Sequence, residues 1–107
     1  MIILFFIIII YIIILLIFKY INNSYYRFLL LFLISLYLIY LFKIKTNILY
    51  FYIIITLLCV ITEIIFIKFF NNTWLYYNNE LINVPFWLIT LWFITIVFIF
   101  QLYNFLL

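Results

Sequence analysis

Four long apolar runs, separated by short polar stretches, make up the chain. A helix needs about 20 mostly apolar residues to cross a bilayer, within a range of about 17 to 25. Backbone groups in lipid must find their hydrogen-bond partners within the protein, which favours helices over open sheets. The pattern therefore predicts an all-α integral membrane protein with three to four transmembrane helices joined by short loops. The predicted helices cover residues 2–18, 28–42, 48–70 and 84–107.

The run over residues 28–42 is shorter than the other three, so the pattern leaves open whether it crosses the membrane fully. Tyr26 and Arg27 precede this run, and Lys43 and Lys45 follow it. Tyrosine rings settle at the headgroup level and long basic side chains reach towards water, which lengthens the effective span of a short helix.

The last run has a clear start signal. Asn83 is a residue type that caps helices, and Pro85 follows it two positions later. Proline is tolerated in the first turn of a helix because the N–H group that it lacks has no intrahelical partner there. We therefore expect Asn83 to cap the fourth helix and Pro85 to lie in its first turn.

Composition excludes a water-soluble domain. Hydrophobic residues make up 76% of the 107 positions and charged residues only 7%, so residues 1–107 are expected to form a single transmembrane unit. With no His and one Cys, the chain alone is not expected to hold zinc, haem or an iron–sulfur cluster. The net charge of +3 is too small to favour nucleic acid. Other membrane subunits and lipids are the expected partners. The chain alone is expected to bind no cofactor, and structural phospholipid is a candidate ligand.

The residue types indicate an A+T-rich gene. Gly, Ala, Asp and His are absent, whereas Ile, Phe, Tyr, Asn, Lys and Leu, which A+T-rich codons encode, are frequent. Residues 2–18 lack both the basic start of a secretory signal and the Arg-rich pattern of a transit peptide. We therefore expect an organelle-encoded protein of the mitochondrial inner membrane.

The absence of Gly and Ala also bears on packing. Helices in membranes approach closely through small residues, and this chain carries bulky side chains all round. This favours a subunit that packs against partner proteins and lipid within a larger assembly. The A+T bias by itself also removes Gly and Ala, and the two explanations are compatible.

A stripe of polar residues runs along the third predicted helix. Tyr52, Thr56, Cys59 and Glu63 are spaced by four, three and four positions, which places them on one helix face. Burial favours the neutral form of a carboxyl group, so Glu63, with Tyr52 and Thr56, is the candidate proton relay. Two readings stay open: a helix that ends at Ile67 leaves Glu63 near the interface, whereas one that continues to residue 70 places it deeper.

The stretch Cys59–Glu63 resembles the membrane carboxylate region of the 4L subunit of respiratory NADH:ubiquinone oxidoreductase, complex I. The tight first hairpin with Tyr26 and Arg27 looks similar to that family too, and the resemblance covers residues 1–70. It implies a subunit that is not catalytic on its own and binds no cofactor. It further implies proton relay in the membrane arm, coupled to quinone reduction elsewhere, with Glu63 as the titrating group.

A structural protein is the alternative. A lineage-specific subunit of mitochondrial ATP synthase or cytochrome c oxidase would fill a groove or bind lipid without any proton chemistry. The surroundings of Glu63 distinguish the two functions. A relay needs hydrated or titratable groups within hydrogen-bond reach, whereas a structural subunit would place Glu63 at a headgroup or against an arginine of a partner.

Overall fold

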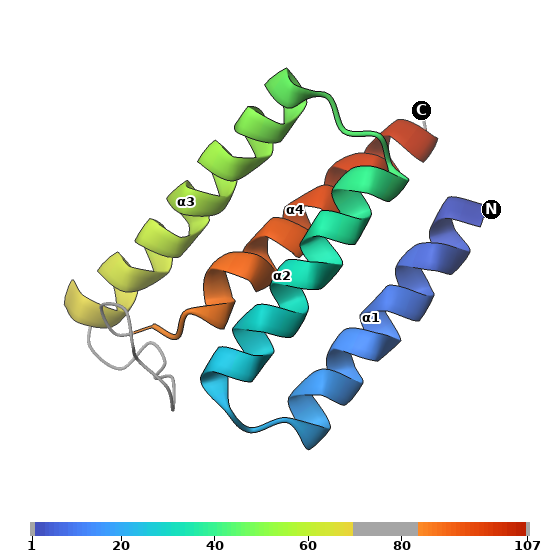
Figure 1. Ribbon diagram of the computed structural model, residues 1–107. Coiled ribbons are helices and arrows are strands. Elements are labelled where there is room, and N and C mark those ends of the chain that lie inside the picture. Colours follow the sequence, from blue (N-terminus) through green and yellow to red (C-terminus); the bar gives the residue numbers. More distant parts are fainter. Residues whose placement is uncertain (1, 70–83, 107) are drawn as a thin grey trace.

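A computed structural model describes residues 2–69 and 84–106 of the chain. In this part of the chain the fold is all-α, as predicted, and each helix runs opposite in direction to the one before it (Figure 1). The predicted ranges differ from the observed ones by only a few residues at each end. The helices are α1 (Ile2–Tyr20), α2 (Ser24–Leu41), α3 (Thr46–Phe69) and α4 (Trp87–Leu106).

Three of these helices, α2, α3 and α4, are long and apolar enough to cross a membrane. The apolar stretch described within α1, Leu4–Tyr20, is shorter, although the whole helix has 19 residues. The chain is therefore a multi-pass membrane protein.

The second helix is longer than predicted because Asn23 caps it. The side-chain oxygen of Asn23 accepts hydrogen bonds from the backbone N–H groups of Tyr25, at 2.9 Å, and Tyr26, at 3.2 Å. These bonds satisfy donors that the first helical turn leaves unpaired. Residues 24–27, which the hydropathy pattern assigned to a loop, thus form the first turn of α2 and give it 18 residues.

Arg27 closes the turn between α1 and α2. Its Nε donates to the carbonyl of Ile21 at 2.6 Å, and its Nη2 donates to the carbonyl of Phe18 at 3.0 Å. The guanidinium carbon also lies 4.7 Å from the centre of the Phe18 ring. A cation near the unpaired carbonyls at the end of a helix is stabilising, so one side chain fixes both the end of α1 and the angle of the hairpin.

The start of α4 differs from the prediction. The helix begins at Trp87, so Pro85 lies before its first turn rather than in it, and Asn83 lies outside the described residues. The carbonyls of Pro85 and Phe86 accept bonds from the N–H groups of Leu88 and Ile89, at 3.2 and 3.3 Å. These bonds span three residues, so the chain passes through a tight 3₁₀-type turn before regular α-helix begins.

The core of the bundle is centred on α4. This helix packs mainly against α2 and α3, whereas contacts between α2 and α3 themselves are few and α1 packs more loosely along α2 and α4. In Figure 1, α4 passes behind the space that separates α2 from α3. The main core consists of buried residues from all four helices. They are Ile10, Ile14, Leu31, Leu38, Tyr52, Phe93, Ile94, Ile96 and Val97.

We expect Ile94→Val in this core to lower the free energy of unfolding by about 1 kcal/mol. Ile94 is 1% exposed, so its lost methyl group leaves neighbouring atoms without packing partners. Ile99→Val on the same helix is the matched control, because Ile99 is 53% exposed and should lose almost nothing. Reversible unfolding of both variants in mixed detergent micelles measures the difference, and equal values would show that α4 is not the centre of the core.

Candidate functional site

The three candidate relay residues lie along the face of α3 that packs on α4. Tyr52 and Thr56 are each only 2% exposed, and Glu63 is half-buried. Val60, which is also buried, lies one turn after Thr56 and just before Glu63. An apolar side chain therefore separates the two hydroxyl groups from the carboxyl group along this face.

The hydroxyl groups of Thr56 and Tyr52 form hydrogen bonds with groups other than Glu63. The hydroxyl of Thr56 donates to the carbonyl of Tyr52 at 2.8 Å, in the preceding turn of α3. This is the usual behaviour of threonine inside a helix, and it directs the hydroxyl proton away from Glu63. The phenol oxygen of Tyr52 accepts from the side-chain amide of Gln101 on α4 at 3.5 Å, which is long for a hydrogen bond.

Glu63 is held by α4. The indole N–H of Trp92 donates a hydrogen bond to the carboxyl oxygen Oε2 of Glu63. A tryptophan N–H in an apolar environment needs an acceptor, and a carboxyl group in the same environment needs a donor. The pair satisfies both requirements and links the third and fourth helices where their faces meet.

The depth of Glu63 follows from the length of α3. The helix continues past Ile67 and reaches Phe69, which is the deeper of the two readings left open by the sequence. Glu63 lies about 9 Å along the helix axis from Phe69, at about 1.5 Å per residue. The carboxyl group therefore lies more than one helical turn before the last described residue of α3, and it faces α4.

A cleft between α3 and α4 exposes the carboxyl group to the outside of the bundle. Its volume is about 230 Å³, and it is open on one side. The cleft is the point at which a group from outside could reach Glu63. Its lining residues are Glu63, Leu88, Leu91, Trp92 and Thr95.

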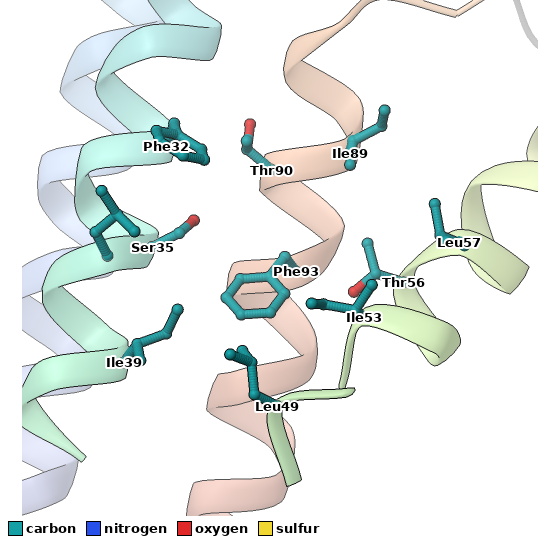
Figure 2. Close-up of a pocket in the computed structure, with 11 residues that line it drawn as sticks. Phe32, Ser35, Ile39, Leu49, Ile53, Thr56, Leu57, Ile89, Thr90 and Phe93 are labelled. Carbon is teal, nitrogen blue, oxygen red and sulfur yellow. The ribbon is translucent and has the colours of Figure 1, made fainter. Parts of the chain in front are cut away.

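An apolar groove of about 230 Å³ lies on the other side of α4, between α2 and α3 (Figure 2). The ring of Phe93 lies between the side chains that α2 and α3 contribute. Three hydroxyl groups also line the groove, but Ser35, Thr56 and Thr90 donate to carbonyls of their own helices at 2.8 to 2.9 Å. The surface of the groove is therefore apolar, and the three hydroxyl groups that line it already donate their protons to backbone carbonyls.

Sequence reasoning missed Trp92, the residue that orients Glu63. Its signal was present, because an indole N–H within a long apolar helix requires an acceptor and Glu63 is the only carboxylate inside an apolar run. The two residues are 29 positions apart in the sequence, and nothing in the sequence shows which faces of α3 and α4 meet. The pairing could therefore not be predicted.

No group of three His, Cys, Asp or Glu residues in ranges 2–69 and 84–106 is placed to hold a metal ion. Cys59 is a half-buried free thiol on α3. The site is defined by Glu63, Trp92 and the cleft beside them.

No protein-family model, curated protein or solved structure matches the chain.

Proposed function

We propose that the chain is a non-catalytic membrane subunit of a mitochondrial respiratory complex, namely the proton-pumping membrane arm of NADH:ubiquinone oxidoreductase. The observation that carries this proposal is the position of Glu63. Its carboxyl group lies inside the span of α3, is oriented by Trp92 and opens into the cleft between α3 and α4. The resemblance of Cys59–Glu63 to the membrane carboxylate region of the 4L subunit supports the same assignment.

The open side of the cleft supports a place in a larger assembly. A carboxyl group at membrane depth is costly where only acyl chains cover it, and such residues usually face protein or a hydrated cavity. A helix of a neighbouring subunit over this cleft would supply a polar partner or water. The bulky exposed side chains of α1, α2 and α3 offer further surface for such neighbours.

The route of the proton in this proposal runs between subunits rather than along α3. Thr56 donates to the carbonyl of Tyr52, and Val60 lies between these residues and Glu63. The stripe of α3 therefore supplies the carboxyl group, and the partner across the cleft supplies the next proton donor or acceptor. Tyr52 and Thr56 then serve packing between α3 and α4.

A purely structural subunit of ATP synthase or cytochrome c oxidase is the second candidate. The bond of Thr56 to its own helix favours it, because a structural subunit needs no hydrated path from Tyr52 to Glu63. In this function the bond from Trp92 to Glu63 would only join two helices.

Separation of mildly solubilised native membranes on a native gel tests the proposal. Mass spectrometry of each band is expected to find this chain in the band that oxidises NADH. A chain that migrates with ATP synthase or cytochrome oxidase activity would overturn the complex I assignment and favour the structural subunit. A chain that migrates alone would overturn the assignment to any complex.

A further inference from the structure

The end of the bundle opposite Glu63 carries a pocket with a different chemistry. It has a volume of about 550 Å³ and lies where the α2–α3 loop meets the end of α4. We call it the hairpin mouth. It is lined by Phe42, Lys43, Ile44, Lys45, Asn47, Ile48, Phe51, Tyr52, Phe100, Gln101, Tyr103 and Asn104.

The polar part of the hairpin mouth attracts anions. Lys43 and Lys45 bring two ammonium groups, while the amides of Asn47 and Asn104 add neutral hydrogen-bond donors. None of the lining residues is acidic. Glu63, the only carboxylate among the described residues, lies about 27 Å along α3 from Lys45. Among the described residues, therefore, no carboxylate within the mouth neutralises the two lysines.

The turn that carries the lysines is closed by two backbone hydrogen bonds. The N–H of Lys43 donates to the carbonyl of Tyr40, and the N–H of Ile44 donates to the carbonyl of Ile39, both at 3.2 Å. These two bonds form a Schellman motif, which places Lys43 in the left-handed region with φ of 51°. Glycine is the residue usually preferred at this position, and here Lys43 occupies it.

The apolar part of the hairpin mouth continues from the charged rim into the membrane. The ring of Phe100 stacks on Tyr52 with centroids 5.6 Å apart, and Phe51 meets the same ring edge-on at 5.5 Å. A ligand for this pocket thus needs a negative charge at one end and hydrocarbon at the other. A phospholipid with an anionic headgroup has both, and it is present in the plane where the helix ends lie.

We propose that the hairpin mouth binds one anionic phospholipid, with its phosphate at Lys43 and Lys45 and the start of its acyl chains against Phe51 and Phe100. The inference does not depend on the respiratory complex to which the chain is assigned. Each lysine near an anionic headgroup contributes about a 5.4-fold gain in affinity, so the two together give about 30-fold.

Native mass spectrometry of the full chain in neutral detergent micelles tests this site. We expect one molecule of phosphatidylglycerol to bind about 30-fold more tightly than phosphatidylcholine with the same acyl chains. The variant Lys43→Gln/Lys45→Gln should lose this preference. The control Lys19→Gln/Lys68→Gln removes the same charge from the other end of the bundle and should keep it.

Two further measurements keep the result specific. Lys43→Gly places the preferred residue in the left-handed turn, so it should unfold no more easily than the unchanged chain while its preference for phosphatidylglycerol falls about fivefold. Inorganic phosphate in excess should not displace the lipid, because it has no acyl chains. Equal binding of the two lipids, equal loss in the control variant, or displacement by phosphate would each overturn the proposal.

Discussion

Replacing Glu63 with Gln is expected to lower proton pumping by the proposed complex by at least about tenfold while leaving that complex assembled. Glutamine keeps the shape of the side chain, and its carbonyl oxygen can still accept the bond from Trp92. It cannot release a proton, so a loss of pumping would report the chemistry of the carboxyl group rather than its packing. Acidification by membrane vesicles that hold the variant complex measures the effect.

Trp92→Phe is the matched control for the Glu63 prediction. Phenylalanine keeps an aromatic ring against α3 but removes the N–H donor, so the carboxyl group stays in the cleft with one partner fewer. We expect pumping to fall less than in Glu63→Gln and the assembled complex to become less stable. If Glu63→Gln pumps as well as the unchanged protein, the relay function is wrong and the structural subunit is favoured.

Arg27→Met is expected to lower the free energy of unfolding by about 3 kcal/mol. The two bonds from Arg27 to the carbonyls of Ile21 and Phe18 come from a charged donor at the end of α1. Methionine keeps an apolar stem of similar length and removes both bonds. Unfolding of the purified chain by increasing fractions of a denaturing detergent measures the loss.

Two other variants separate charge from geometry in the Arg27 prediction. Arg27→Lys keeps the charge but loses the planar fork that reaches two carbonyls, so it should recover only part of the stability. Lys19→Met removes a charge at the same end of the bundle, where the ammonium group lies 5.1 Å from the ring of its neighbour Tyr20. A loss as large in Lys19→Met as in Arg27→Met would show that net charge, not the bonded turn, sets the stability.

Hydropathy predicted the helices because lipid leaves the backbone few other choices. Each of the four apolar runs overlaps one observed helix, since a chain in a bilayer must pair its N–H and C=O groups locally. Hydropathy did not predict the first residues of α2 and α4, because specific hydrogen bonds determine where these helices begin. Asn23 starts α2 within residues that look like a loop, and Pro85 lies before α4 because a tight turn precedes the helix.

The candidate site was predictable only in part. Helical spacing placed Tyr52, Thr56 and Glu63 on one face of α3, and that face packs on α4. Which residue of α4 faces the carboxyl group depends on how the two helices are rotated and shifted against each other. Bulky side chains on every face, with no stripe of small residues, leave that alignment unmarked in the sequence, so Trp92 became apparent only from the fold.

Because α4 is the centre of the core and is the last of the four helices to be synthesised, the other helices must wait for it before they can pack. Contacts between α2 and α3 are few, so residues 2–69 alone have little to cover the faces that α4 occupies. A packed core can form only after residues 87–106 have left the ribosome and entered the bilayer. Until then the face of α3 that bears Glu63 lies open to lipid. The yield of folded protein would then depend on an insertase or an early-binding partner that shields this face.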